Sequence, residues 1–252
     1  MSEPSDNSAL KPLSVVIPVC DEEGSIETLL KELLQALGPR YALEVVLVDD
    51  GSVDTSPALV EKIAKEDSRV RLIRHAKRSG KSAALRTGME AAKNLWVATI
   101  DGDGENNPAD IINMVDEVDL DRVEAVGLVC GIRKRRTAGK NRLIASRIAN
   151  WIRRNALKDD CPDTACGMKV IPRTLFLAFP FFDGLHRYLP ALSKHYGYET
   201  RHVMIEDRPR FAGASKYTNF GRAKVGIVDL LGVMWLMRRT SVSRRPTVPI
   251  GE

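Results

Sequence analysis

Short apolar runs alternate with amphipathic stretches over the first hundred residues of the chain. The apolar runs are rich in β-branched and aliphatic residues and have the length of buried strands, whereas the stretches between them repeat apolar residues at helical spacing. The predicted strands are residues 13–19, 44–48, 70–74 and 95–100, and the predicted helices are residues 26–37, 57–65 and 82–92. Strands that alternate with helices indicate an α/β fold, a mostly parallel sheet with helices on both faces.

The second half of the chain carries two segments with a distinct pattern. Residues 141–157 predict an amphipathic helix whose apolar positions, opposite a basic face, are Ile144, Ile148, Trp151 and Ile152. Residues 225–237 are almost entirely apolar but too few to cross a bilayer, which needs about 20 residues. This second segment is therefore expected either to lie in the membrane interface or to form a buried helix.

These patterns predict one main domain with short flanking segments. We expect an α/β domain over residues 13–222, a flexible N-terminus over residues 1–12 and a disordered tail over residues 240–252. The apolar C-terminal helix is expected over residues 223–239.

Acidic residues follow three of the predicted strands. The strand ends carry residues 18–23, 49–52 and 101–105, and each of these segments contains carboxylates. In open parallel sheets, ligands bind beyond the carboxyl ends of the strands. The sequence therefore predicts that the three acidic ends meet at one binding site.

The third of these segments is the most informative. Asp101, Asp103 and Glu105 alternate with glycines, and an extended backbone would put all three side chains on one side. Three crowded carboxylates repel one another unless a cation lies among them, and oxygen ligands suit Mg²⁺ or Mn²⁺. Mg²⁺ usually binds through one or two carboxylates plus substrate phosphates, which implies a phosphorylated substrate. The alternative for a short motif of this kind is an acidic, solvated turn.

Positive charge gathers in one part of the chain. The formal net charge is +5, and residues 131–158 hold ten Lys and Arg residues without an acid among them. Such a stretch attracts phosphate, a membrane surface or nucleic acid. RNA binding usually adds exposed aromatic residues for stacking, and only 6% of this chain is aromatic, so we expect no nucleic-acid partner.

Other signatures of metal or nucleotide sites are absent from the sequence. The four cysteines lack a paired C-x-x-C spacing, which argues against structural zinc and favours reduced thiols in a cytoplasmic protein. The four histidines lack metal-binding spacing, and the polar N-terminus has no signal-peptide pattern. Gly80–Lys81–Ser82 matches the end of a phosphate-binding P-loop, but His75 occupies the position of its first glycine, so we reject that motif.

Taken in order, the motifs resemble those of the family 2 glycosyltransferases of the GT-A fold. Within that family they are most similar to the polyprenyl-phosphate glycosyltransferases, the dolichol-phosphate mannosyltransferase branch. The resemblance extends from about residue 13 to about residue 220. The matching segments are residues 14–18 with 21–23, 48–52, 80–84 ahead of Gly88, 101–103 with 107–108, Asp163 with 166–168, and 210–217.

The resemblance implies roles for the acidic residues. The residues implied to hold the nucleotide are Pro18, Glu22, Asp50 and Asp101. Asp101 and Asp103 would also bind Mg²⁺ or Mn²⁺ against the diphosphate, so Asp103 counts among the implied catalytic residues. Glu105 stands where this branch usually has glutamine, and its extra charge would bind either the metal, as a third ligand, or a basic side chain.

The resemblance also assigns the basic residues. Arg133 and Arg147 fall where related enzymes bind the acceptor phosphate, and Arg210 and Lys216 match a catalytic pair that closes over the diphosphate and the acceptor phosphate. Asp163 lies nearest to the usual catalytic-acid region; the alternative is that it orients an arginine or caps a turn. A phosphomonoester with a second pKa near ~6 is largely anionic at pH 7, so no dedicated general base is required.

The implied activity is a metal-dependent, inverting transfer of a sugar from a UDP- or GDP-linked donor to a polyprenyl phosphate, giving a lipid-linked monosaccharide for the cell envelope. The protein would bind peripherally to the cytoplasmic face of the membrane, either through anionic lipid or through a partner membrane protein. Two alternatives stay open: a family 2 enzyme that uses a soluble or polysaccharide acceptor, and, more distantly, a non-catalytic basic α/β protein that binds nucleotides or nucleic acid.

Overall fold

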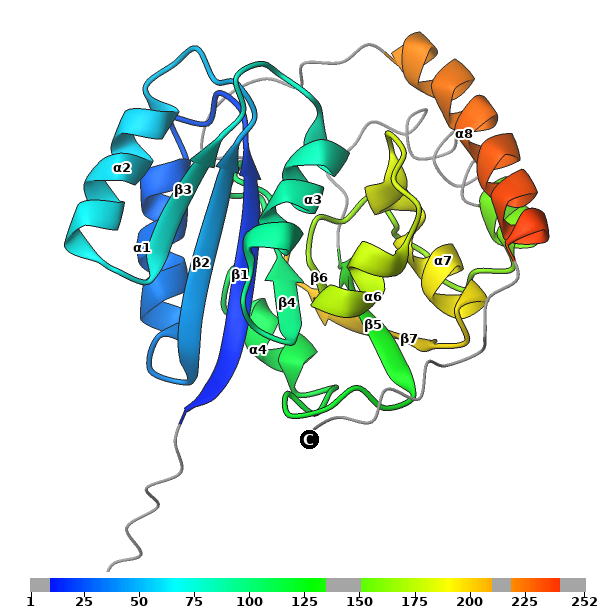
Figure 1. Cartoon of the computed structure of the whole chain (residues 1–252), viewed down its shortest axis with the longest axis horizontal. Coiled ribbons are helices and arrows are strands. Elements are labelled where there is room, and N and C mark those ends of the chain that lie inside the picture. The colour runs from blue at the N-terminus through cyan, green and yellow to red at the C-terminus, as the bar shows by residue number, and fades with distance from the viewer. Residues whose placement is uncertain (1–9, 135–150, 210–218, 241–252) are drawn as a thin grey trace, which may run out of the picture.

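The computed structural model describes residues 10–134, 151–209 and 219–240 of the chain. They form a seven-stranded sheet in the order β3-β2-β1-β4-β6-β5-β7 (Figure 1). The strands are β1 (Lys11–Val19), β2 (Tyr41–Asp49), β3 (Val70–Arg74), β4 (Trp96–Thr99), β5 (Val126–Arg133), β6 (Lys169–Pro172) and β7 (Glu199–Ile205). The helices are α1 (Ile26–Leu37), α2 (Ser56–Glu66), α3 (Lys81–Ala91), α4 (Asp110–Val115), α6 (Arg173–Ala178), the 3-10 turn η1 (Leu185–Arg187), α7 (Leu189–His195) and α8 (Asn219–Arg239).

The elements predicted for the first hundred residues are confirmed, with boundaries that differ by three residues or fewer. The predicted flexible N-terminus, residues 1–12, extends too far, because β1 begins at Lys11. Lys11 pairs with Tyr41 in the parallel ladder of β1 and β2, and its ammonium lies 2.7 Å from a carboxylate oxygen of Asp121. Backbone pairing with β2 therefore extends the strand beyond its apolar run.

Helices cover both faces of the sheet, as the alternation of elements predicts. On β1, Val15 and Ile17 pack with α1, α2 and α4, whereas Val16 packs on the opposite face with α3, α6 and α7. Figure 1 shows α3, α6 and α7 in front of the sheet and α1 and α4 behind it. Successive side chains of a strand point to opposite faces, and burying each Val or Ile contributes roughly 1.5–3 kcal/mol. The continuous apolar runs are thus explained by burial on both faces.

The direction of the strands determines what gathers at the carboxyl edge of the sheet, the edge at which β1, β2 and β4 end. These strands are parallel, β6 is antiparallel to both β4 and β5, and β7 is parallel to β5. The connection over residues 134–168 therefore leaves β5 at the carboxyl edge and returns into β6 at that same edge. Consequently Arg133 and Lys169 lie at the same edge as Asp101.

Helix α8 contains the predicted apolar segment and buries only part of it. Val233 is 2% exposed and packs on the face formed by α3, α6 and α7. Four large apolar residues remain 60–64% exposed, and we call them the apolar strip of α8: Ile227, Val228, Leu231 and Trp235. Of the two interpretations, a fully buried helix is therefore wrong. Within the described ranges, no helix is long and apolar enough to cross a membrane.

The described end of the predicted amphipathic helix, residues 151–157, is helical, but its buried and exposed positions do not follow the predicted division into an apolar and a basic face. Trp151 and Ile152 are 68% and 46% exposed, whereas Arg153, expected on a basic outer face, is 8% exposed. Arg153 bonds to the Cys161 carbonyl, and its guanidinium lies 3.2 Å from a carboxylate oxygen of Asp159. Asp159, which follows the basic stretch, binds Arg153, so this arginine is buried instead of lying with the basic face.

Candidate active site

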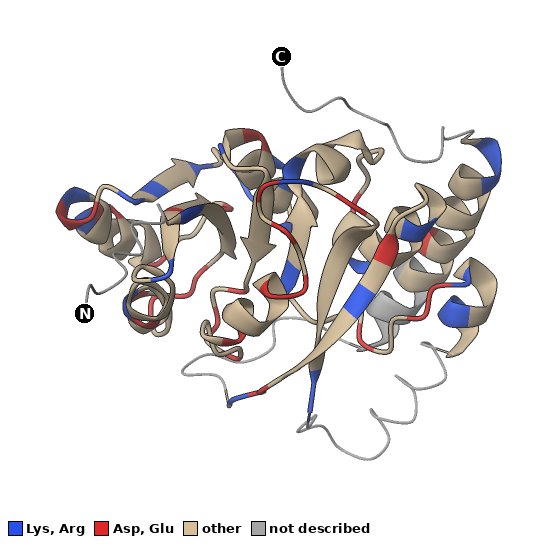
Figure 2. Cartoon of the chain, turned by 90° about the horizontal axis from the view of Figure 1, so that it is seen from below, with Lys and Arg blue, Asp and Glu red and all other residues tan. Residues whose placement is uncertain are grey.

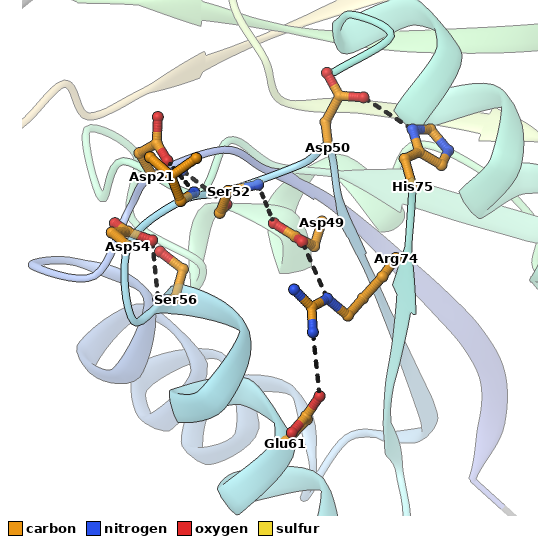
Figure 3. Close-up of polar contacts among 10 residues, drawn as sticks. Asp21, Asp49, Asp50, Ser52, Asp54, Ser56, Glu61, Arg74 and His75 are labelled. Atoms are coloured by element: carbon orange, nitrogen blue, oxygen red, sulfur yellow. Dashed lines mark hydrogen bonds and ion pairs between the residues drawn. The ribbon is translucent and has the colours of Figure 1, made fainter. Parts of the chain in front are cut away.

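The acidic ends of β1, β2 and β4 lie together at the carboxyl edge. The Asp50 amide donates to the Val19 carbonyl at 2.8 Å, which ties the end of β2 to the end of β1. The Ser25 hydroxyl donates to the Gly102 carbonyl at 2.7 Å and joins the start of α1 to the segment after β4. The Asp21 amide donates to Ser52 Oγ at 2.9 Å (Figure 3). These contacts confirm the predicted convergence.

Pro18 and Glu22 flank the turn after β4. A Cβ at Gly102 would lie 3.3 Å from the Pro18 carbonyl oxygen and 3.6 Å from Glu22 Cγ. Gly102 stands between Asp101 and Asp103, so the two predicted nucleotide-binding residues border the predicted metal-binding segment. The Glu22 amide is held by Ser56 Oγ at 2.8 Å, which fixes this end of β1 against α2.

Asp50 is 4% exposed and its carboxylate is fully engaged by its own chain. It accepts hydrogen bonds from the amides of Ser79 and Gly80 at 2.8 and 2.7 Å and from His75 Nδ1 at 2.8 Å (Figure 3 shows the His75 contact). Because an ionised carboxylate only accepts hydrogen bonds, Nδ1 carries the proton. Asp50 thus shapes the segment 75–80 that leads into α3, and its nucleotide contact stays a prediction.

Asp49, the neighbour of Asp50, shapes the turn after β2. Its carboxylate accepts from the Ser52 amide at 3.1 Å and from Arg74 Nε at 3.4 Å, and Arg74 also lies 3.9 Å from Glu61 of α2 (Figure 3). The Asp54 carboxylate accepts from the Ser56 amide at 2.9 Å. These carboxylates build the loop rather than face a ligand.

Asp101 is bound by Lys81, the first residue of α3. The Lys81 ammonium lies 2.5 Å from Asp101 Oδ1, and both side chains are about 30% exposed. On its other side Asp101 touches Gly167, where a Cβ would fall within 2.5 Å of all three carboxyl atoms. Burial raises the pKa of Asp101, but the positive charges of Lys81, Lys169 and Arg133 outweigh it and leave that pKa below its ordinary value. Asp101 is therefore ionised and rigidly held.

The segment after β4 forms a turn, so the expected extended geometry is wrong. Gly104 has φ +74°, and residues 102–104 form a turn and bend. Asp103 is 7% exposed and accepts from the Glu105 amide at 3.1 Å, while the Glu105 carbonyl accepts from the Arg208 amide at 2.7 Å. The glycines allow a chain reversal that strand alternation does not describe.

The oxygen donors suit a hard cation, although the expected trio is not preassembled. Among the described residues, no group of three or more His, Cys, Asp and Glu side chains is placed to hold a metal. Asp101 and Asp103 still offer two carboxylates, separated in sequence by Gly102 alone, at the carboxyl edge, and Mg²⁺ needs no more when substrate phosphates complete its shell. The predicted metal role of Glu105 stays a prediction.

Arg133 and Asp163, assigned separately from sequence, form one ion pair. Arg133 Nε and Nη2 donate to the two oxygens of Asp163 at 2.8 and 3.1 Å, and the side chains are 17% and 5% exposed. Burial lowers the pKa of Arg133, but the hydrogen bonds and charge of Asp163 more than compensate and raise it. The pair supports the alternative in which Asp163 orients an arginine. Arg147, Arg210 and Lys216 lie outside the described residues.

Sequence reasoning missed two further residues of this edge, Lys81 and Lys169. Lys81 lay in the Gly80–Lys81–Ser82 motif, whose rejection as a P-loop left its charge unassigned. Lys169 is 4% exposed, and its ammonium bonds to the Thr164 and Cys166 carbonyls. A lysine at the first position of a short apolar strand gives no sequence signal. All four cysteines are free thiols.

The comparison with known families supports a functional site at the carboxyl edge of the sheet. The family described as Glycosyl transferase family 2 matches residues 14–178, which include the ends of β1, β2 and β4 and the Arg133–Asp163 pair. The chain belongs to this family. The resemblance inferred from the motifs is thus confirmed, and the protein is a glycosyltransferase by family.

Relatives of this family 2 glycosyltransferase act on lipid phosphates. The chain is 32% identical over 231 residues to the dodecaprenyl-phosphate galacturonate synthase of Rhizobium johnstonii, covering 90% of this chain and 67% of the relative. It is 30% identical over 234 residues to an undecaprenyl-phosphate 4-deoxy-4-formamido-L-arabinose transferase of Aeromonas hydrophila, covering 91% and 68%. The chain thus spans about two thirds of the length of these relatives.

Solved structures support the GT-A fold. Glucosyl-3-phosphoglycerate synthase from Mycobacterium tuberculosis, crystallised with Mn²⁺, UDP and phosphoglyceric acid, matches with a TM-score of 0.65 at 19% identity, covering 92% of this chain and 80% of that one. Mannosyl-3-phosphoglycerate synthase from Rubrobacter xylanophilus matches with a TM-score of 0.65 at 17% identity, covering 94% and 78%.

Proposed function

We propose that this family 2 glycosyltransferase transfers a sugar from a nucleotide-sugar donor to a polyprenyl phosphate, with inversion at the anomeric carbon. One observation carries the proposal: the acidic ends of β1, β2 and β4 and the Arg133–Asp163 pair lie at the same edge around Asp101. That edge offers carboxylates for a metal-bound diphosphate beside a guanidinium for a second phosphate. The two relatives named above, a dodecaprenyl-phosphate and an undecaprenyl-phosphate transferase, support a polyprenyl acceptor.

Asp101 and Asp103 are the residues that would hold Mg²⁺ or Mn²⁺. A bound divalent ion neutralises the charge that develops on the departing nucleoside diphosphate. Solved structures of the same fold were crystallised with Mn²⁺ or Mg²⁺ and UDP, which supports this cofactor and a uridine donor. Gly167 and Lys81 keep the Asp101 carboxylate in one orientation, so little reorganisation is needed when the donor binds.

The acceptor phosphate would bind at Arg133, with Arg147, Arg210 and Lys216 completing the site. Asp163 holds the Arg133 guanidinium through two parallel hydrogen bonds and leaves its remaining N–H groups for a phosphate. A phosphate oxygen then forms a bond to the anomeric carbon while the bond from that carbon to the diphosphate breaks, and the leaving diphosphate keeps the electron pair. The attacking phosphate is already anionic at pH 7, so no proton must be removed.

The protein would reach its lipid acceptor by lying on the membrane surface. The apolar strip of α8 leaves large side chains in water, and its last turn ends in the exposed Arg238 and Arg239 (Figure 2 shows basic residues at that end). The segment 151–157 belongs to the same packed face as Val233 of α8 and exposes Trp151 and Ile152. Exposed apolar side chains next to arginines suit the boundary of an anionic bilayer.

The decisive experiment supplies the protein with undecaprenyl phosphate, Mg²⁺ or Mn²⁺ and a panel of labelled UDP- and GDP-sugars, and follows the label into the organic phase. A metal-dependent lipid product from one donor is expected, and Asp103→Asn should abolish it while leaving the circular dichroism spectrum unchanged. The matched control is Asp121→Asn, an exposed acid paired with Lys11. Transfer only to water-soluble acceptors would overturn the acceptor class.

Membrane docking is tested by flotation with vesicles. Wild-type protein should float with vesicles that contain phosphatidylglycerol, and Trp235→Asp should reduce the floating fraction. Val53→Asp is the matched control, because Val53 is 94% exposed on the turn before α2. Equal flotation of both variants would remove α8 from the docking surface and favour a partner membrane protein.

A further inference from the structure

His186, a residue that the proposed mechanism does not use, is held in a defined orientation beside the site. It lies in η1, and its Nδ1 is 2.8 Å from the hydroxyl oxygen of Ser82 on α3. That hydroxyl oxygen also accepts a hydrogen bond from the Gly184 amide at 3.1 Å. Ser82 is 3% exposed, so its hydroxyl group is not hydrogen-bonded to solvent.

This arrangement determines which ring nitrogen carries the proton. If Nδ1 were protonated, Ser82 would accept two hydrogen bonds and its own buried O–H would lack an acceptor, which is unfavourable. If Nδ1 accepts instead, the Ser82 O–H donates to it and every group is satisfied. The proton therefore sits on Nε2, and His186 presents an N–H group rather than a lone pair.

The charges around His186 keep it neutral. Burial is the largest cause that lowers the pKa of His186 well below its usual value, and the positive charges of Lys81, Arg187 and Lys169 lower it further. The side chain of His186 nevertheless keeps some exposure, and in the described part of the chain its Nε2 makes no hydrogen bond. A fixed, uncharged donor is thus available to a ligand and cannot act as a general base through Nε2.

His186 belongs to the same edge as Asp101. Ser82 directly follows Lys81, and the Lys81 ammonium lies 2.5 Å from the Asp101 carboxylate. We propose that His186 is a donor-binding and specificity-determining residue whose Nε2–H donates a hydrogen bond to a hydroxyl or ring oxygen of the transferred sugar. The inference rests on the proposed function, because it presumes that the nucleotide sugar binds at Asp101.

The Nε2–H group of His186 is a better hydrogen-bonding partner for the transferred sugar than for the diphosphate. The charged diphosphate oxygens are matched by the divalent ion and by ammonium and guanidinium groups, which make stronger, charge-assisted hydrogen bonds. A neutral N–H fixed in one direction instead recognises a neutral oxygen in one position. A site built around such a donor rejects sugars that lack the matching oxygen, because the donor would then be left unpaired.

The test compares the binding of nucleotide sugars with the binding of the bare nucleotide. Calorimetry with Mn²⁺ measures UDP, UDP-galacturonate, UDP-glucose, UDP-N-acetylglucosamine, GDP and GDP-mannose. For the nucleotide sugar that binds wild-type protein most tightly, His186→Ala should weaken binding at least 10-fold while its bare nucleotide changes less than 2-fold. His186→Gln should restore part of the loss, because its side-chain amide also carries an N–H.

The matched control is His195→Ala, which removes a histidine bonded to the Thr240 carbonyl at the end of α8. An equal loss for nucleotide and nucleotide sugar, or no loss for either, would overturn the assignment of His186 to the sugar. Failure of wild-type protein to bind any of these nucleotides would instead overturn the proposed function, so the two failures are distinguishable.

A second measurement addresses the proton itself and does not depend on activity. ¹⁵N spectra of histidine-labelled protein should show His186, identified by its loss in His186→Gln, protonated at Nε2. The bound nucleotide sugar should shift this resonance, whereas the bare nucleotide should leave it in place. Protonation at Nδ1 would overturn the proposal. Ser82→Ala should release the ring and reproduce the sugar-selective loss of binding, although Ser82 itself touches no ligand.

Discussion

The substitution Asp50→Asn tests whether the Asp50 carboxylate stabilises the loop of residues 75–80 or binds the nucleotide. In wild-type protein Oδ1 accepts from His75 Nδ1 and the Ser79 amide, and Oδ2 accepts from the Gly80 amide. The asparagine oxygen can keep the first two donors, but its NH₂ group then faces the Gly80 N–H, so one hydrogen bond is lost and two donors oppose each other. At 4% exposure, water cannot repair this contact.

The magnitude follows from the lost bond. A hydrogen bond to a charged group contributes about 1.5–3 kcal/mol. In a domain of this size each kcal/mol shifts the melting temperature by roughly 2–4 °C, so Asp50→Asn should lower it by about 3–12 °C. Asp121→Asn makes the same chemical change at a side chain that is 62% exposed, where we expect less than about 0.5 kcal/mol.

Thermal unfolding followed by circular dichroism measures this difference directly, and UDP binding is measured on the same samples. Because the Gly80 amide precedes Lys81, loosening the loop should also weaken UDP binding. The reasoning is refuted if Asp50→Asn has the same melting temperature as wild-type protein yet fails to bind UDP. That result would assign the carboxylate to the nucleotide instead of the segment 75–80.

Three further substitutions test other parts of the site. Gly167→Ala should lower kcat/KM for sugar transfer about 100-fold, because a Cβ there meets the Asp101 carboxyl within 2.5 Å and displaces it; a wild-type rate would contradict this packing. Asp163→Ala leaves the Arg133 guanidinium buried without its partner and should cost about 3–5 kcal/mol in urea unfolding, whereas a loss below 1 kcal/mol would mean that solvent reaches the pair. Burial and then the charge of Asp229 raise the pKa of Tyr188 from 10 to about 12, so its contribution of roughly 3 kcal/mol is complete below pH 10 and lost as the pH rises through about 12; Tyr188→Phe should flatten the stability curve over that window.

The sequence predicted those features that depend on neighbouring residues along the chain. The β-branched runs that become β1 and β2 are buried on both faces, so their composition identifies them without tertiary information. The meeting of the acidic strand ends at one site was predicted by the same reasoning, because parallel strands that lie side by side bring their ends together. Helix 26–37 matched to the residue since its apolar positions all face one side of the sheet.

The remaining features depend on partners far apart in sequence. Arg133 meets Asp163 only because the connection between β5 and β6 returns to the edge it left, and nothing local to either residue signals the pair. Lys81 likewise meets Asp101 only because the fold brings the start of α3 to the end of β4, and nothing in the sequence around Asp101 signals that contact. Arg153 was counted with the basic face of the predicted helix, but its partner Asp159 follows the basic stretch, outside the window in which helical periodicity is judged.

If the acceptor phosphate binds at Arg133 as we propose, the connection between β5 and β6 makes the acceptor side of this enzyme exchangeable. Val129 and Cys130 of β5 pair with Val170 and Lys169 of β6, and the Gly131 amide donates to the Met168 carbonyl at 3.1 Å, so the two strands pair without residues 134–162. A chimaera could replace residues 134–162 with the equivalent stretch from a relative of different acceptor preference. It would keep Asp163 opposite Arg133 and Gly167 against Asp101, and so leave the nucleotide half intact. Natural diversification of lipid carriers within such a family could follow the same route, through cassette replacement instead of accumulated point mutations.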